Sequence, residues 1–349
     1  MPSISSPLGA LPSRFRRERV LVVGCGDVGL RVVGLLNGRV NLYALTSSPS
    51  RVNPLRQAGV KPIVGDLDAP ATLSRLSGLA TRVLHLAPPP RVESGAWWRD
   101  ARTLALARSL RLRSLPASFV YGSTSGVYGD CGGAGIDETR AVRPDTPRAH
   151  RRVDAECTVR WLGRAGVSTR ILRIPGIYAS DREGGTPRER LLRGTPVLRA
   201  EDDVYTNHIH ADDLARVCVT ALWRGGPQRV FHVNDDSEIK MGDYVDLAAR
   251  LYGLPSPPRI ARMEARAQLP LSLLSFMGES RRLDNRRLKR ELRVRLRYPT
   301  VASGLLAMPL SEPPAVQAQP ERVGCILERV GGEGEGCNPP VSTGKIRSI

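Results

Sequence analysis

A glycine-rich turn that joins a short apolar segment to an amphipathic one is the feature that most constrains this chain. Residues 19–23 read Arg-Val-Leu-Val-Val, and residues 24–29 read Gly-Cys-Gly-Asp-Val-Gly. In such a strand-turn-helix unit the first glycine permits the tight turn, the second lets backbone N–H groups approach a pyrophosphate, and the third lets helix and strand pack closely. The spacing therefore predicts a dinucleotide-binding turn. The residues expected to bind there are Gly24, Gly26, Asp27, Val28 and Gly29.

Apolar, β-prone segments alternate with helical patterns along the chain. The expected strands are 19–23, 40–45, 62–64, 82–86, 118–121, 168–174 and 229–233. The expected helices between the early strands are 28–36, 54–58, 71–76 and 97–110. Because parallel strands need a crossover that covers a face of the sheet, the alternation predicts an α/β fold with a doubly wound parallel Rossmann sheet.

The pattern also divides the chain into parts. We expect a disordered leader over 1–18 and a Rossmann domain over 19–175, whose sheet is completed by strands near 168–174 and 229–234. From 176 to 309 the alternation breaks, which predicts a small C-terminal substrate domain with scattered helices such as 241–252 and 281–292. Residues 310–349 are rich in Pro, Gly, Glu and Gln, and we expect a disordered tail there.

Length and composition exclude several classes of protein. With 349 residues, 41% of them apolar, the chain can bury a substantial core. Its longest apolar runs, 20–23 and 217–223, are far shorter than the roughly 18–20 residues of a membrane-spanning helix. The leader lacks the apolar region of a secretory signal, and the six cysteines include no Cys-x-x-Cys pair. We therefore expect a cytoplasmic protein without a metal site, disulfide framework or membrane association.

The net charge of +18 invites a nucleic-acid interpretation. However, 52 basic residues include only four lysines, so 48 are arginines, and these are spread over nearly every segment. The densest cluster, 281–297, also contains acids and alternates with leucines, as a short amphipathic helix followed by an extended segment would. We interpret it as a solvated face and expect no nucleic-acid partner, because no aromatic residues for base stacking are interleaved with it.

The segment after the second expected strand bears on the choice of dinucleotide. An NAD site normally has an acidic residue there to accept both ribose hydroxyls, but residues 28–65 contain no Asp or Glu. Instead, Thr46 and Ser47 are followed by Arg51, and hydroxyls with a guanidinium suit a 2′-phosphate. We therefore predict NADP in preference to NAD; the alternative is an ordinary solvated turn and a site that accepts either.

Several further segments resemble the extended short-chain dehydrogenase/reductase family, also called the NAD-dependent epimerase/dehydratase family, over about residues 20–305. They are Gly65-Asp-Leu-Asp68, His85-Leu-Ala-Pro-Pro89, Tyr121-Gly-Ser-Thr-Ser-Gly-Val-Tyr-Gly129, Leu172-Arg-Ile-Pro-Gly-Ile-Tyr178, Asn207-His-Ile-His-Ala-Asp-Asp213 and 282–298. The spacing of the glycines, Gly-x-Gly-x-x-Gly, is similar to an atypical subgroup. The resemblance implies further cofactor contacts from Asp66, Leu67, Leu86, Ala87, Pro88, Ser123, Arg152, Pro175 and Ile177.

The chain departs from that family at the catalytic pair. The family has a Tyr, and four residues later a Lys that lowers the tyrosine pKa, on one face of a helix. Aligned on residues 154–156, these two positions are Arg148 and Arg152. Arg152 can donate hydrogen bonds to ribose, but neither guanidinium can shuttle a proton near neutral pH. Thr124, at the position of the family's Ser/Thr, can donate a hydrogen bond to a substrate oxygen.

Other side chains are candidates for the missing acid or base, and each has a structural alternative. Tyr128 resembles the family's structural Val-Tyr-Gly tyrosine, which can reach the substrate pocket. His150 titrates near neutral pH, but two residues along a helix turn it away from position 148. His208 and His210 are candidate substrate contacts; the alternative is that each is a hydrogen-bonded histidine that fixes the loop before Asp212.

Two functions remain open at this point. The first is an NAD(P)-dependent oxidoreductase or epimerase/dehydratase-like enzyme that acts on a sugar-like or other hydroxyl or carbonyl small molecule with a non-standard active site. The second is a catalytically impaired NAD(P)-binding sensor or scaffold, which Arg148 and Arg152 favour. We lean to the enzyme, because the segments on the substrate side persist. The family resemblance also implies a homodimer through residues 97–110 and 148–162.

Overall fold

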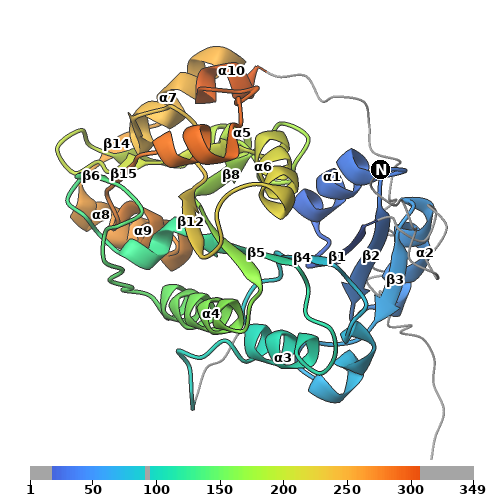
Figure 1. Ribbon diagram of the computed structural model, residues 1–349. Helices are drawn as coiled ribbons and strands as arrows, with labels where there is room; N and C mark the ends of the chain where they lie inside the picture. Colours follow the sequence, from blue (N-terminus) through green and yellow to red (C-terminus); the bar gives the residue numbers. More distant parts are fainter. Residues whose placement is uncertain (1–17, 91–94, 307–349) are drawn as a thin grey trace, which may run out of the picture. The chain divides into compact units, whose positions relative to one another are not determined.

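A seven-stranded, wholly parallel sheet forms the centre of the computed structural model, which describes residues 18–90 and 95–306 (Figure 1). All described residues belong to one compact unit. The sheet has the order β12-β7-β5-β4-β1-β2-β3. Its strands are β1 (Arg19–Val23), β2 (Asn41–Thr46), β3 (Lys61–Val64), β4 (Arg82–His85), β5 (Ser118–Thr124), β7 (Ser168–Ile174) and β12 (Arg229–His232).

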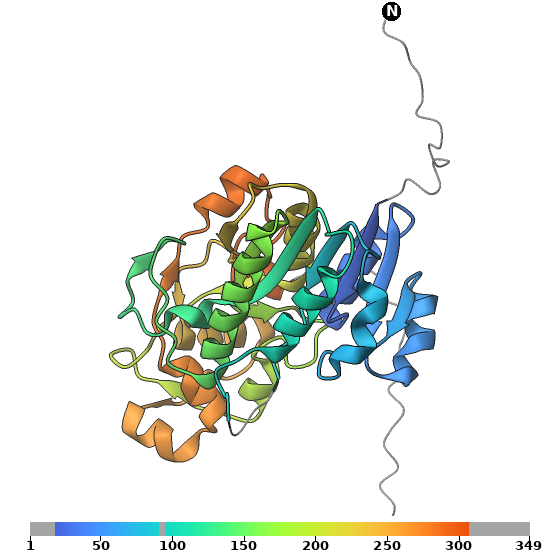
Figure 2. The ribbon, with the colours of Figure 1, turned by 60° about the horizontal axis from the view of Figure 1, so that its bottom comes forward.

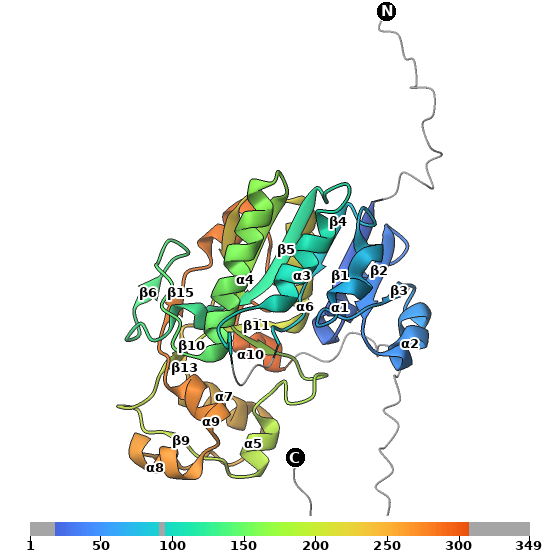
Figure 3. The same ribbon diagram turned by 90° about the horizontal axis from the view of Figure 1, so that it is seen from below.

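Helices cover both faces of this sheet, which explains why its central strands are apolar on both sides. One face packs against α1 (Asp27–Leu36), α2 (Val52–Gln57) and α6 (Ala211–Trp223). The other packs against α3 (Ala101–Leu110), α4 (Pro147–Arg164) and the 3₁₀ helix η3 (Pro70–Leu76). Figure 3 shows α3 and α4 side by side on the same side of β4 and β5. The two hydrophobic cores therefore lie on opposite sides of one sheet.

The order of the strands creates a switch point beside β1. The chain runs outward from β1 through β2 to β3, then returns to the other side of β1 with β4 and continues through β5 and β7 to β12. Ligands of open parallel sheets bind outside the carboxyl ends of the strands at such a point. The glycine turn that follows β1 lies there.

Short paired strands and small helices form the part of the molecule beyond β7 and β12 (Figure 2). The pairs are β6 (Gly135–Ile136) with β15 (Arg282–Leu283), β8 (Gly176–Tyr178) with β11 (His208–His210), β9 (Val197–Leu198) with β14 (Arg259–Ile260), and β10 (Tyr205–Thr206) with β13 (Ile239–Lys240). The helices are α5 (Arg188–Leu192), α7 (Met241–Tyr252), α8 (Arg262–Gln268), α9 (Leu271–Met277) and α10 (Val301–Leu305). No helix in the described ranges has the length and hydropathy needed to cross a bilayer.

The predicted fold class is confirmed, and the expected strands are found within a few residues. The expected helix over 281–292 is wrong. Its first residues form β15, and the helix is confined to the end of the segment, where residues 286–287 lead into a π-helical turn, Leu288–Leu292, whose Leu288 and Leu292 are buried. The predicted leader and tail lie outside the described residues, except for Glu18, which pairs with Arg82.

Candidate functional site

The glycine turn after β1 is shaped for close approach of another group. Gly24 has φ +89°, and a Cβ there would lie 2.3 Å from the backbone N of Ala87, which follows β4. Gly29 packs against the turn, since its Cβ would lie 2.9 Å from the Gly24 carbonyl oxygen. Around Gly26, by contrast, no atom lies within 4 Å of a built Cβ. The turn is thus closed on the sheet side and open at Gly26.

Helix α1 begins directly at this open position. Its N-cap is Gly26, which has no side-chain cap, so the first N–H groups have no acceptor within the helix. Such a helix start attracts an anion through these N–H groups and the helix dipole. Asp27 in the first turn forms an ion pair with Arg31, which also pairs with Asp181 and Asp212. The acid at the helix start is therefore neutralised by protein groups, and the half-buried Val28 completes the first turn.

The end of β2 supplies hydroxyls and a guanidinium beside the same turn. Thr46 ends the strand and accepts a hydrogen bond from the backbone N of Ser48 at 3.2 Å, while Ser47 is exposed. The Arg51 Nη2 donates to the Cys25 carbonyl oxygen at 2.8 Å. Although Arg51 is 26 residues from the glycine turn in sequence, its side chain is thus fixed against that turn.

The loops after β3 and β4 form a further wall. Asp66 is half-buried and Leu67 is buried. Arg102, from α3, links the two loops, because it pairs with Asp68 and donates to the Pro88 carbonyl oxygen at 3.2 Å. Leu86 and Ala87 both donate their backbone N–H to the Val23 carbonyl oxygen. Pro175 and Ile177, which follow β7, are half-buried at the same end of the sheet.

The two arginines at the family's Tyr and Lys positions differ in their partners. The Arg152 Nη1 donates to the Gly122 carbonyl oxygen at 2.7 Å and to the Tyr121 hydroxyl at 3.0 Å, which places its guanidinium over the end of β5. Arg148, one turn earlier on α4, is exposed. Although part of the Arg148 side chain is accessible to solvent, the protein around its guanidinium desolvates it and so lowers its pKa; the charge of Arg152 adds to this effect, and the Glu279 carboxylate opposes it.

Thr124 lies at the end of β5, next to residues that the sequence did not single out. Its hydroxyl oxygen accepts from the Gly126 N–H at 3.3 Å and retains its own proton for donation. A Cβ on Gly126 would lie 3.7 Å from both the Thr124 hydroxyl oxygen and the Glu279 Oε2. Glu279 accepts from the buried Arg281 at 2.7 Å, and Arg281 also donates to the Gly129 carbonyl oxygen at 2.9 Å. The interpretation of Arg281 as part of a solvated face is therefore wrong.

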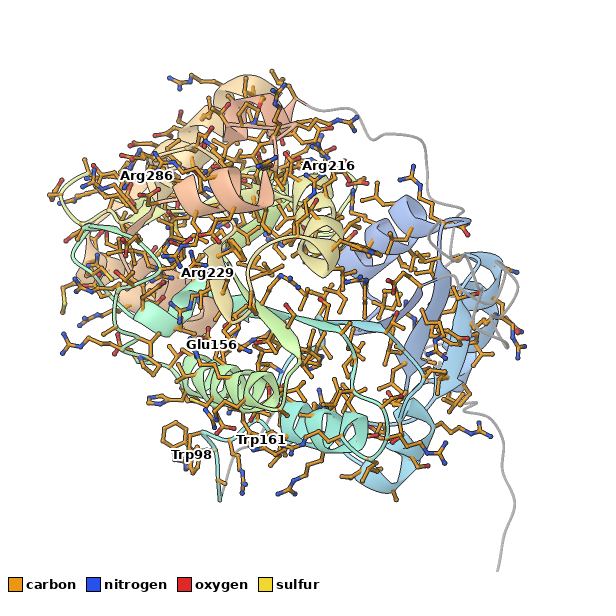
Figure 4. The ribbon with its side chains drawn as sticks, viewed as in Figure 1. Trp98, Glu156, Trp161, Arg216, Arg229 and Arg286 are labelled. Atoms are coloured by element: carbon orange, nitrogen blue, oxygen red, sulfur yellow. The ribbon has the colours of Figure 1, made fainter. Side chains whose placement is uncertain are left out.

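A buried polar chain links β5, α4, β7 and β12. The Ser123 hydroxyl donates to Glu156 at 2.7 Å, and Glu156 forms a two-pronged ion pair with Arg173. Figure 4 labels Glu156 on α4. The Arg173 Nη1 donates to the Tyr128 hydroxyl at 2.6 Å, and that hydroxyl in turn faces the His232 Nε2. Tyr128 is 1% exposed, and burial raises its pKa to about 12. Its hydroxyl is thus occupied inside the protein.

The remaining candidate histidines lie away from Thr124 or have structural partners. The His210 Nδ1 accepts the N–H of Asp212 at 3.2 Å and so caps α6. His208 is buried beneath the ring of Tyr244, with centroids 4.2 Å apart, and its Nδ1 has no partner among the described residues. His150 contacts the ring of Trp97. For His210 the hydrogen bond to Asp212 supports the structural alternative, a histidine that fixes the loop before that residue.

A cavity in the described part of the chain does not coincide with the glycine turn. It has a volume of about 690 Å³ and lies between β6, β15 and the loop after β12. Both acidic and basic side chains line it, including Asp235, Glu238 and Arg282. We place the candidate site at the glycine turn, because the chemistry of the backbone and the switch point of the sheet coincide there. No group of His, Cys, Asp or Glu suited to a metal ion occurs within residues 18–90 and 95–306.

Comparisons with known proteins show which family and which solved structures the chain resembles. The profile of the NAD dependent epimerase/dehydratase family matches residues 20–233. Similar solved structures include a functionally unknown conserved protein from Silicibacter pomeroyi DSS, with 27% identity and a TM-score of 0.64. Others are a UDP-glucose 4-epimerase from Thermotoga maritima, with 20% identity and a TM-score of 0.67, and a UDP-glucuronic acid 4-epimerase from Bacillus cereus in complex with NAD, with 18% and 0.64. Each alignment covers 82% of this chain and 96% of the other. No curated protein matches the chain.

Proposed function

We propose a function on the premise that this chain belongs to the NAD dependent epimerase/dehydratase family. It is a nicotinamide-dinucleotide-dependent oxidoreductase or epimerase for a sugar-like or other hydroxyl or carbonyl compound. The observation that carries this proposal is the glycine turn, where Gly24 has no room for a side chain and Gly26 lies open at the uncapped start of α1. When bound, the dinucleotide would supply or accept a hydride.

The residues around the turn fit the successive parts of a dinucleotide. The N–H groups of Asp27, Val28 and Gly29 would hold the diphosphate at the start of α1. Asp66 and Leu67 would hold the adenine end. At the other end, the cofactor contacts expected from family resemblance are Leu86, Ala87, Pro88, Ser123, Arg152, Pro175 and Ile177. Ser123 would act indirectly, because its hydroxyl donates to Glu156.

We propose that the preferred form is NADP. Arg51 is held against the glycine turn by one nitrogen, and its side chain is otherwise exposed beside Thr46 and Ser47. A guanidinium in that position can donate charge-assisted hydrogen bonds to a 2′-phosphate. The absence of any acid from 28 to 65 removes the carboxylate that would repel this phosphate.

On the substrate side, the proposal assigns hydrogen-bond donation to Thr124 and positive charge to Arg152. Both would stabilise an oxyanion as it develops on the substrate. Tyr128 is not used for proton transfer in this scheme, because its hydroxyl already interacts with Arg173 and His232. The Glu279 carboxylate borders the Thr124 turn, since its Oε2 lies 3.7 Å from a Cβ built on Gly126, and we assign proton exchange with the substrate hydroxyl to it.

One observation favours a second function, that of a sensor or scaffold that binds the nucleotide. The position where the family has its tyrosine is Arg148, and a guanidinium cannot serve as the base. A protein with the cofactor turn but without turnover would be a sensor or scaffold. Two assays distinguish the functions: an oxidoreductase consumes NADPH with a panel of sugar-like aldehydes and ketones, and an epimerase interconverts sugar epimers in the presence of NADP⁺ without net consumption of the nucleotide. A sensor binds the nucleotide and does neither.

The cofactor part of the proposal is tested by thermal shift with NADP(H) and NAD(H). At equal concentration, a ligand that binds only the folded state raises the melting temperature more the more tightly it binds, so the shifts rank the two cofactors. We expect a larger shift with NADP(H), and we expect Arg51→Glu to abolish this preference. If Arg51→Glu leaves the ranking unchanged, Arg51 does not bind the phosphate.

A further inference from the structure

Three guanidinium groups converge on the turn after β5. Arg148 and Arg152 lie on one face of α4, four residues apart, and Arg152 reaches the end of β5 through Gly122. Arg281 approaches the turn from the segment before β15, where its Nη2 lies 3.4 Å from the Ser125 hydroxyl oxygen. This cluster, Arg148, Arg152 and Arg281, adjoins Thr124, the residue to which we assign hydrogen bonding to the substrate.

The hydrogen-bonding capacity of this cluster is only partly used. No described residue accepts a hydrogen bond from Arg148 or forms an ion pair with it. Arg152 and Arg281 are 9% and 8% exposed, and the Nε of each is buried without a partner among the described residues. Buried donors are normally satisfied, so unpaired ones at a candidate site indicate a missing acceptor. Together these atoms provide several N–H donors for a ligand.

The electrostatic surroundings also favour an anion. Arg148 is the second residue of α4, so a positive charge stands at the positive end of the helix dipole, and the first turn of α4 contains no acid. Three carboxylates act on the cluster: Glu279 pairs with Arg281, Asp130 interacts electrostatically with Arg281, and Asp100, which caps α3, interacts with Arg152. None of these carboxylates forms an ion pair with Arg148, so its guanidinium at the start of α4 is available to an anion.

We infer that this cluster binds an oxyanion group of the substrate, a carboxylate or a phosphate, close to the carbon that reacts. The guanidinium fork matches both groups, because it can donate two parallel hydrogen bonds to their oxygens. In this arrangement Arg148, at the position of the family's tyrosine, is a binding residue and not a catalytic one. The inference rests on the proposed function and narrows its substrate class to acidic compounds.

The first test compares Arg148→Gln with Arg164→Gln, an exposed arginine at the other end of α4. The full chain, with and without saturating NADP(H), is melted in potassium phosphate and in potassium chloride of equal ionic strength. We expect phosphate to raise the melting temperature of the wild type and of Arg164→Gln, and Arg148→Gln to bind phosphate about tenfold or more weakly. In chloride Arg148→Gln should melt no lower than the wild type, because it removes a like charge from Arg152.

The second test identifies the group with three sugars that share one ring. Glucuronate carries a carboxylate, glucose 6-phosphate a phosphate, and glucose neither. A stabilisation by either charged sugar that Arg148→Gln removes and Arg148→Lys partly restores supports the inference and tells which oxyanion is preferred. If Arg148→Gln and Arg164→Gln respond alike to phosphate and to both charged sugars, the inference is overturned. A lack of response to NADP(H) and NAD(H) would instead contradict the cofactor assignment, since the anion response is also measured without nucleotide.

Discussion

Four of the five histidines are buried, and for three of them burial strongly disfavours the charged form in the folded protein. Burial lowers the pKa of His85, His208 and His232 to about 3 in each case. For His232 the neighbouring charge of Arg173 adds to this effect. In the unfolded chain a histidine has a pKa near 6.5. Between these values the unfolded state takes up protons that the folded state does not.

Stability should therefore fall as the pH falls below about 6.5. Each such histidine contributes a loss of about 1.4 kcal/mol per pH unit once its unfolded form is protonated. Burial raises the pKa of Asp235 to about 7, so this carboxyl group acts in the opposite direction over the same interval and offsets one histidine. We predict that acidification from pH 6 to pH 5 destabilises the protein overall.

His208→Phe isolates one of these contributions, because the ring can still stack on Tyr244. Urea unfolding at pH 8 gives the cost of the substitution itself, since His208 is then neutral in both states. From pH 6 to pH 5 the variant should lose about 1.4 kcal/mol less than the wild type. Equal losses in the two proteins would mean that His208 is protonated in the folded state.

Some residues of the candidate site could be predicted from the sequence, and others could not. Gly24 was predictable, because a tight turn after a strand requires a residue without a side chain, and its φ of +89° agrees. Glu279 and Arg281 were not, because they reach Thr124 only through the fold, more than 150 residues later in the chain. The run of charges around Arg281 looked solvated, since sequence does not show which of several arginines points inward.

At the scale of elements, α4 is fixed to the sheet by a buried ion pair. Glu156 and Arg173 have side chains that are 1% and 3% exposed, and they join α4 to β7. Removal of one partner leaves the other charge buried without compensation, which costs about 3–5 kcal/mol. We therefore predict a loss of that size for Arg173→Gln in urea unfolding.

Arg160→Gln provides the matched control, because Arg160 also pairs with Glu156, at 3.4 Å, but from an exposed position. Such pairs contribute roughly 0–1 kcal/mol. A similar loss of unfolding free energy in both variants would show that burial of the pair between Arg173 and Glu156 adds nothing to stability.

The elements themselves were largely predictable, because apolar strands and intervening amphipathic helices follow simple periodicities. The segment from 281 to 292 was the exception. Its leucines recur at helical spacing. However, Leu283 lies in β15 and pairs with β6, whereas Leu288 and Leu292 are buried in the hydrophobic core to which β12 also contributes. Pairing with residues 135–136 overrides the local preference there, and no local pattern announces a partner so distant in sequence.

At the scale of the whole molecule, the proposed function depends on where the glycine turn after β1 lies in the sheet. The switch point between β1 and β4, the uncapped start of α1 and the open space at Gly26 all occur at the same place. The assignments of Thr124, Arg51 and the arginine cluster follow from a dinucleotide that lies across this place. The domain boundary near 175, the homodimer and the cytoplasmic location remain predictions.

Calorimetric titration of the wild type and of Gly26→Leu with NADPH tests whether a dinucleotide binds across this turn. The space around Gly26 is open, so a leucine there should leave the urea midpoint nearly unchanged, whereas it would occupy the path of the diphosphate. We predict saturable binding to the wild type and at least about a hundredfold weaker binding to Gly26→Leu, a difference of about 2.8 kcal/mol. Equal affinities, or no heat of binding to the wild type with either NADPH or NADH, would contradict the account.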